Sequence, residues 1–389
     1  MEREQAIRLV QQLLTLLKQK NGSDLFITAG FPPAIKVDGH LTPVMDKPVS
    51  PENSALIVRS LMADRQIKEF EATNECQFAI SPPGIGRFRV SAFVQQGCVG
   101  AVLRTINTNI PTFEELGLPE QLKQIALAKR GLVLMVGATG SGKSTSLAAM
   151  LGYRNANSKG HIITIEDPIE YVHAHGGCMV TQREVGIDTH NWDNALKNTL
   201  RQAPDVIQIG EVRTRETMEY AIHFAETGHL VLTTLHANSS NTALDRIINF
   251  FPEEKREQLL MDLGLNLRAI VSQRLIRRET GGRVAAMEIM LNSPLVSDMI
   301  FKGEVAELKD VMARSTEQGM ITFDQFLFDL FEHRIISYEE AIRNADSQNE
   351  VRLRIKLESR RAAQNLLEDD VVKRMQLLAD DDAGQIIRR

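Results

Sequence analysis

The chain has 389 residues, of which 24% are charged, and its 45 basic and 50 acidic side chains give a formal net charge of −5. This length accommodates two or three domains with buried cores, and the negative balance does not indicate a dedicated nucleic-acid-binding protein. The three cysteines, Cys76, Cys98 and Cys178, form no C-x-x-C pair, so the sequence predicts neither a zinc site nor a disulfide framework.

The first residues predict a helix and not a targeting segment. The charged start leads into residues 4–19, where apolar side chains recur at helical spacing. No apolar run in the sequence approaches the roughly twenty residues of a membrane span. We therefore expect a cytoplasmic protein with no integral membrane segment.

A small α+β domain is expected over residues 1–107. Short segments of alternating polarity follow the first helix, and Pro and Gly pairs separate them. The predicted strands are residues 24–28, 34–37, 76–80, 87–94 and 100–106, with a helix at 55–61 between them. This order favours an antiparallel sheet, and the domain is expected to end at a linker over residues 108–112.

From residue 113 onward, strands alternate with helices. The predicted strands are residues 132–136, 162–165, 206–209 and 230–235, and the predicted helices are residues 119–128, 194–201 and 214–226. This order predicts an α/β domain with a parallel, doubly wound sheet over residues 113–290. Beyond residue 253 most segments are expected to be helical. We expect a helical subdomain over residues 291–353 and a charged helical or disordered tail over residues 354–389.

The most specific motif is G-x-x-x-x-G-K-[ST], which follows the apolar segment 132–136 and precedes a segment compatible with a helix. It comprises Gly137, Ala138, Thr139, Gly140, Ser141, Gly142, Lys143, Ser144 and Thr145. The glycines allow backbone N–H groups to surround a triphosphate, and the helix N-terminus adds positive charge. Lys143 is predicted to reach the β- and γ-phosphates, and Ser144 to offer its hydroxyl to Mg²⁺. The sequence therefore predicts a phosphate loop that binds ATP.

Two carboxylates follow predicted strands of the same sheet. Glu166 comes directly after residues 162–165, and Glu211 follows Gly210 after residues 206–209. In many P-loop enzymes the second strand ends in an aspartate that supports the metal, and Gly210 stands there in this chain. The carboxylate chemistry of hydrolysis is therefore expected to fall to Glu166 and Glu211. The alternative is that each residue caps the following helix.

His229 and His236 lie on either side of the predicted strand 230–235. They are too far apart along a strand to be adjacent metal ligands, so zinc is not favoured. Two interpretations stay open: hydrogen-bonded surface residues, or groups that respond to the γ-phosphate.

These motifs, in this order, resemble the secretion-ATPase superfamily of hexameric motors, and within it the type IV pilus retraction ATPases of the PilT/PilU family. Residues 137–145 match the phosphate loop of that family. Residues 164–170 are similar to its Asp box, 209–213 to its atypical Walker B motif and 225–236 to its His box. Residues 22–25 and 87–90 fit its first domain. The resemblance runs from about residue 5 to residue 350.

The resemblance implies a RecA-like P-loop motor domain with a parallel sheet, preceded by a PAS-like α+β domain and followed by C-terminal helices. It implies that Glu166 is the catalytic base, that Glu211 supports Mg²⁺ and water, and that both histidines sense the nucleotide. Arg89 and Arg104 are the best candidates for arginines that approach the phosphates. A homo-hexamer at the cytoplasmic side of the inner membrane, acting on a platform protein at the pilus base, is also implied.

Two features favour the retraction branch and a PilU-like paralogue within it. Extension and type II secretion relatives usually carry a four-cysteine zinc module, and no cysteine follows Cys178. Self-sufficient retraction enzymes typically have the segment Ala-Ile-Arg-Asn-Leu-Ile-Arg-Glu, and residues 295–302 retain little of it. An accessory to a paralogous retraction ATPase is therefore expected. Two other functions stay open: a ring-shaped nucleic-acid motor, and a regulatory subunit that binds ATP but hydrolyses it weakly.

Overall fold

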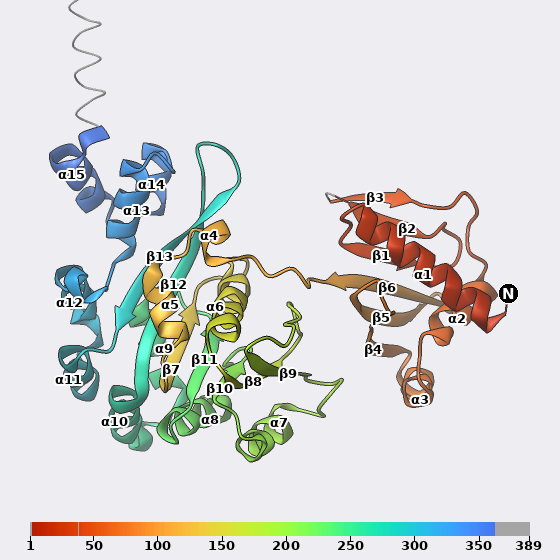
Figure 1. Cartoon of the computed structure of the whole chain (residues 1–389), viewed down its shortest axis with the longest axis horizontal. Coiled ribbons are helices and arrows are strands. Elements are labelled where there is room, and N and C mark those ends of the chain that lie inside the picture. The colour runs from red at the N-terminus through yellow and green to blue at the C-terminus, as the bar shows by residue number, and fades with distance from the viewer. Residues whose placement is uncertain (1, 38, 362–389) are drawn as a thin grey trace, which may run out of the picture. The chain divides into compact units, whose positions relative to one another are not determined.

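The computed structural model describes residues 2–37 and 39–361 (Figure 1). The chain forms two compact units, each described by itself below. The first comprises the chain up to Pro111 together with Arg154–Gly210, and the second comprises Thr112–Tyr153 together with the chain from Glu211 onward. The domain boundaries expected from the sequence stay predictions.

The first unit begins with a six-stranded antiparallel sheet. Its strands are β1 (Asp24–Ile27), β2 (Ala34–Val37), β3 (His40–Pro43), β4 (Glu75–Ile80), β5 (Arg87–Gln95) and β6 (Cys98–Ile106), in the order β3-β2-β1-β6-β5-β4. Its helices are α1 (Arg3–Gln19), α2 (Pro51–Ser60) and α3 (Asp64–Thr73). The apolar stripe of α1, with Val10, Leu14 and Leu17, is buried in one core with Phe78 and Leu103. The expected α+β fold with an antiparallel sheet is confirmed.

The first unit also contains three parallel strands, β8 (Gly160–Glu166), β9 (Cys178–Glu184) and β10 (Val206–Ile209), with β8 paired to both of the others. Helix α7 (Trp192–Thr199) and a 3₁₀ turn at Leu200–Gln202 precede β10. All of β10 and the last five residues of β8 are buried, as expected of parallel strands covered on both faces. Strand β9 was not predicted, because its second half is polar.

The second unit carries β7 (Gly131–Val136), β11 (Leu230–Leu235), β12 (Leu267–Arg277) and β13 (Arg283–Leu291). Strand β7 pairs in parallel with β11 and β12, whereas β13 is antiparallel to β12. Within this unit the strand order is β13-β12-β7-β11. The helices are α4 (Phe113–Leu116), α5 (Glu120–Ala126), α6 (Lys143–Asn157), α8 (Arg215–Glu226), α9 (Ser240–Phe250) and α10 (Arg256–Asn266), with a 3₁₀ turn at Glu253–Lys255.

The expectation of helices beyond residue 253 is wrong for residues 267–291, which form the β12–β13 hairpin. Leu267, Ile270, Val271 and Leu275 follow one another at helical spacing, so the apolar pattern of β12 imitates a helix. The middle of β12 is buried on both faces, and its polar residues Ser272 and Gln273 are buried too, where they bond to other parts of the unit. For these reasons β12 lacks the alternation of polar and apolar residues that marks a half-buried strand.

The C-terminal part is helical, as expected. It contains α11 (Pro294–Lys302), α12 (Leu308–Arg314), α13 (Phe323–Glu332), α14 (Tyr338–Asn344) and α15 (Gln348–Glu358), with 3₁₀ turns at Val305–Glu307 and Thr316–Gln318. Ile276 and Val284 of the hairpin share a core with α13, α14 and α15, which lie together in Figure 1. Most of the tail expected over residues 354–389 lies outside the described residues. Among the described residues, no helix has the length and apolarity needed to cross a membrane.

Candidate functional site

The phosphate loop joins the end of β7 to the start of α6. Gly137 has φ +152° and Gly142 has φ +89°, and side chains at either position would collide with neighbours. A Cβ on Gly137 would lie 2.5 Å from the Ser141 Oγ, and one on Gly142 would lie 2.7 Å from the Gln273 Nε2. Both positions therefore require glycine, and the loop turns back on itself tightly enough to present backbone N–H groups.

Lys143 is the first residue of α6, and its ammonium group lies over the loop. The Nζ donates hydrogen bonds to the carbonyl oxygens of Gly137 and Ala138, both at 2.9 Å, and the residue is 8% exposed. These two bonds hold a positive charge beside the loop at the N-terminus of a helix. This is the arrangement that binds phosphate groups in such loops.

Gln273 of β12 fixes the loop and was missed by the sequence analysis. Its Nε2 donates to the Ser141 carbonyl oxygen at 2.9 Å, and its Oε1 accepts from the Ser146 hydroxyl at 2.8 Å. The side chain is 2% exposed. One buried amide thus connects the loop, the first turn of α6 and β12. No local signal in the sequence indicates this, because the partners are more than 120 residues apart.

A cavity of about 320 Å³ opens beside the loop. It is lined by loop residues, Gln273 and Leu275, the loop after β11 through Asn238, and two arginines, Arg274 and Arg283. The guanidinium of Arg274 pairs with Asp346 at 2.7 Å and also donates to the Asn238 carbonyl oxygen at 3.3 Å. The cavity therefore combines backbone donors with cationic side chains, which suits a polyanionic ligand.

Glu211 and His236 lie close together in the second unit. Their Oε2 and Nε2 atoms are 3.3 Å apart, and Arg213 pairs with the other carboxylate oxygen. The Glu211 side chain is 15% exposed, whereas that of His236 is 41% exposed. A hydrogen bond from the Val212 N–H to the Thr234 carbonyl oxygen ties this segment to β11.

The donor set of this region fits Mg²⁺. The Oε2 of Glu211 is buried and accepts no hydrogen bond of good geometry from the described residues. Ser144, which follows Lys143 in the first turn of α6, offers a hydroxyl oxygen at the end of the phosphate loop. Mg²⁺ prefers such oxygen ligands and is usually held by one or two protein groups together with substrate phosphates.

The structure does not bring His229 together with His236. Leu230 and Leu235 of β11 pair with Gly131 and Val136 of β7, so His229 lies at the amino ends of these strands. The phosphate loop follows their carboxyl ends, about 20 Å away over six residues. The His229 Nδ1 lies 3.1 Å from both the Phe224 carbonyl oxygen and the Thr227 hydroxyl. Within this chain its surroundings are those of a hydrogen-bonded residue at a strand end, and its sensing role stays a prediction.

In the first unit, Glu166 ends β8 as a buried carboxylate. It accepts hydrogen bonds from the Thr164 hydroxyl at 2.6 Å and from the Gln182 Nε2 at 3.2 Å, both on Oε1. Burial raises the pKa of Glu166 to about 7, although these two bonds lower it, and the charge of Glu170 adds to the increase. A carboxylate with such a pKa is suited to accept a proton near neutral pH.

Gly210, at the end of β10, leaves the space that Glu166 needs. A Cβ at this position would lie 3.3 Å from both the Glu166 Cα and the Ile165 carbonyl oxygen, and 3.5 Å from the Trp192 ring. An aspartate at residue 210 would therefore crowd the end of β8. This crowding gives a physical reason for finding the acidic residue one position later, at Glu211.

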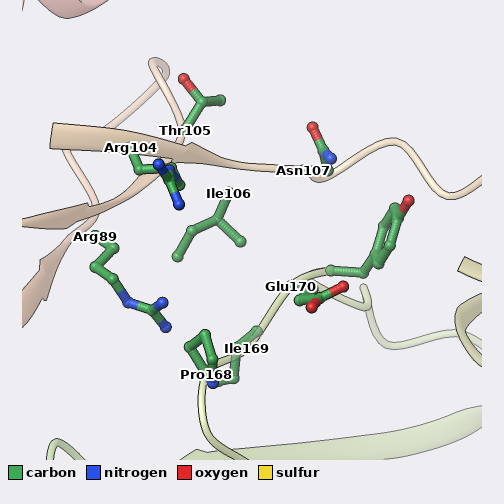
Figure 2. A pocket seen from close by; sticks show the side chains of 9 residues that line it. Arg89, Arg104, Thr105, Ile106, Asn107, Pro168, Ile169 and Glu170 are labelled. Atoms are coloured by element: carbon green, nitrogen blue, oxygen red, sulfur yellow. The ribbon is translucent and has the colours of Figure 1, made fainter. Parts of the chain in front are cut away.

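Arg89 and Arg104 face each other on β5 and β6 and line one cavity of about 270 Å³ in the first unit. Figure 2 shows their side chains on one side of it and Pro168, Ile169 and Glu170 on the other. Each guanidinium already has a carboxylate partner. Arg89 pairs with Glu184 at 2.7 Å and Arg104 with Asp24 at 2.8 Å.

Residues 1–319 match the family model described as "Type II/IV secretion system protein". The chain belongs to this family. It is 59% identical to the type IV pilus ATPase PilU of Pseudomonas aeruginosa, over 97% of this chain and 99% of that protein. It is 42% identical to the retraction ATPase PilT of the same organism, over 85% of this chain and 96% of that protein. A crystal structure of the pilus retraction motor PilT with bound ADP has 38% identity and a TM-score of 0.79, over 87% of this chain and 98% of that one.

Membership of the Type II/IV secretion family confirms the recognised resemblance to PilT and PilU, the α/β fold with a parallel sheet, and the ATPase activity. The assignment of residues 137–145 as the ATP-binding loop stays a prediction. In the second unit, the Lys143 Nζ binds carbonyl oxygens of the loop, and Glu211 lies beside His236. The structure adds Gln273, Gln182 and Glu184, which no sequence motif indicated.

Proposed function

We propose that this chain is the subunit of a hexameric ring ATPase that assists type IV pilus retraction, as an accessory to a paralogous retraction ATPase. The observation that carries the proposal is the phosphate loop, where the Lys143 Nζ binds a loop carbonyl oxygen, together with the Glu211–His236 pair. Both occur in a chain that is 59% identical to PilU over almost its whole length. We place the ring in the cytoplasm, peripheral to the inner membrane, where it acts on a platform protein at the pilus base and not on nucleic acid.

Each site residue has a role in this proposal. Lys143 contacts the β- and γ-phosphates, Ser144 and Glu211 hold Mg²⁺, and Glu166 accepts the proton of the attacking water. When bound, Mg²⁺ offsets the negative charge that develops on the phosphates. His236 couples nucleotide state to Glu211.

The remaining assignments concern residues outside that group. Arg89 and Arg104 approach the phosphates once they exchange their present carboxylate partners. His229 is assigned to nucleotide sensing by family resemblance alone.

The accessory role is supported by helix α11. The Ser297 hydroxyl donates to the Gly264 carbonyl oxygen at 2.8 Å, and the Phe301 ring lies so close to Gly264 that a Cβ there would be 2.7 Å away. Lys302 pairs with Asp298 at 2.6 Å on the same helix. These side chains serve packing and local pairing, and none offers the planar fork of an arginine to a partner carboxylate.

An ATPase assay with and without single-stranded DNA, combined with sizing chromatography, tests the enzyme part of the proposal. We expect hydrolysis that does not respond to DNA and a particle six times the mass of the chain. Stimulation by DNA would favour a nucleic-acid motor. Nucleotide binding with negligible hydrolysis would favour a regulatory subunit.

Pilus retraction in cells tests the accessory role. Cells that express this chain but lack the paralogous ATPase are expected to retract pili weakly or not at all, and restoring the paralogue should restore force. Full retraction without the paralogue would refute the accessory role and leave the motor assignment intact.

A further inference from the structure

Four side chains share one face of the β8–β9 ladder. The two strands are parallel, and their register pairs Thr164 with Gln182 and Glu166 with Glu184. Paired residues of neighbouring strands point to the same face of a sheet, and residues two apart do as well. The face that carries Glu166 is therefore lined by a hydroxyl, an amide and a second carboxylate.

The amide of Gln182 is held at both ends. Its Nε2 donates to the Tyr171 carbonyl oxygen at 2.9 Å and to the Glu166 Oε1 at 3.2 Å, and its Oε1 accepts from the His173 N–H at 2.7 Å. A backbone N–H can only donate and a carbonyl oxygen can only accept, so these partners fix which end of the amide is nitrogen. The NH₂ group must therefore point to Glu166.

We propose that Gln182 is a positioning residue for Glu166, and that it holds the carboxylate in the ionised form and the orientation needed to activate water. This inference rests on the proposed role of Glu166 as the catalytic base. The segment 171–173 supports it, because the Tyr171 carbonyl oxygen and the His173 N–H fix both ends of the amide. Thr164 provides the second side-chain donor to the same oxygen.

The charges around Glu166 determine what the loss of this donor does. Burial and the charge of Glu170 favour the protonated acid, and the hydrogen bonds from Thr164 and Gln182 favour the carboxylate. Glu184 is the other carboxylate on this face, and it is paired with Arg89. The backbone N–H of Glu170 also favours the carboxylate. Removing the Gln182 donor is expected to raise the pKa of Glu166 further, because one of these three stabilising hydrogen bonds is lost.

The test compares Gln182→Met with Thr181→Val in the full-length protein. Methionine keeps the length of glutamine but removes both polar atoms. Thr181 is the matched control on the same strand, because its hydroxyl lies 2.8 Å from the Nε2 of His161 and does not contact Glu166. The measurements are kcat, KM for ATP and the pH profile of kcat/KM from pH 6 to pH 10.

We expect Gln182→Met to leave KM unchanged and to move the acid limb of the profile upward by about one pH unit, since one hydrogen bond to a carboxylate has that order of effect. At pH 7 the ionised fraction then falls from about one half to about one tenth, so the rate falls about fivefold and recovers at pH 9. Gln182→Glu, which keeps the side-chain size, should shift the limb further, because a second carboxylate opposes ionisation. Thr181→Val should match the wild type.

Two outcomes would overturn the inference. One is an acid limb at the wild-type position in Gln182→Met and Gln182→Glu. The other is a loss of rate that is the same at every pH, which would indicate a purely structural role.

Glu166→Gln separates this inference from the proposed function on which it rests. If Glu166→Gln hydrolyses ATP normally, the assignment of the base is wrong. If Glu166→Gln is inactive while the Gln182 variants keep the wild-type profile, only the positioning role of Gln182 is wrong.

Discussion

Replacing Gln273 by methionine is expected to loosen the phosphate loop without changing the volume of the core. The wild-type amide makes two buried hydrogen bonds, to the Ser141 carbonyl oxygen and from the Ser146 hydroxyl. Methionine is similar in length and shape, so it fills the site but leaves both partners without their bond. The perturbation therefore tests the polar connection and not the packing.

The expected cost is about 2 to 6 kcal/mol for the unit that contains the loop, because each of the two buried partners left without its hydrogen bond costs about 1–3 kcal/mol. The loosened loop must also be ordered when nucleotide binds, and this lowers the affinity. We expect ADP to bind about tenfold more weakly, which corresponds to about 1.4 kcal/mol of binding free energy.

Thermal unfolding and titration with a fluorescent ADP analogue measure both effects. Ser146→Ala, which removes one of the two bonds, is the matched comparison, and the double variant completes a thermodynamic cycle. We expect a coupling free energy on the order of 1 kcal/mol between the two residues, because they are in direct contact. An ADP affinity and a melting temperature equal to those of the wild type in Gln273→Met would refute the reasoning.

Further predictions concern Lys143, Glu166 and the end of the described chain. Lys143→Ala should abolish hydrolysis while leaving the circular dichroism spectrum unchanged, since it removes a charge but opens no large cavity; wild-type turnover would contradict the phosphate-loop assignment. Glu166→Gln should slow hydrolysis about 100-fold or more at unchanged nucleotide affinity. Because the folded-state pKa of Glu166 is raised to about 7, ionising this residue costs stability as the pH rises from about 4.5 to 7. The variant should therefore be more stable than the wild type at pH 8, on the order of 3 kcal/mol, and equally stable at pH 4; a constant difference across this range would show that ionisation is not the cause. Arg361, which binds the Phe331 and Ile336 carbonyl oxygens and pairs with Glu279, should stabilise the C-terminal helices, so Arg361→Ala should lower their melting temperature. Truncation after Arg361 should leave melting and hydrolysis unchanged, and a loss of either would assign a role to residues 362–389.

The sequence by itself determined the elements whose signals are local. The phosphate loop could be predicted because glycine, lysine and serine act there through the backbone of nine consecutive residues. Strands β7, β8, β10 and β11 could be predicted because a buried parallel strand is a continuous apolar run. The antiparallel sheet could be predicted because its strands alternate and are separated by turn residues.

Only the tertiary structure decided which polar residues are buried and what they bind. Gln273 and Glu184 act through partners that are up to 132 and 95 residues away, so no spacing rule reveals them. The apolar residues of β12 recur at helical spacing, and Gln273 within the strand is polar because it binds the distant phosphate loop. Burial on both faces of the middle of the strand also removes the alternation that marks a half-buried strand. His229 and His236 look equivalent in the sequence, because they lie on either side of one strand. Side chains at opposite ends of an extended strand cannot meet, and in the structure only His236 lies beside Glu211.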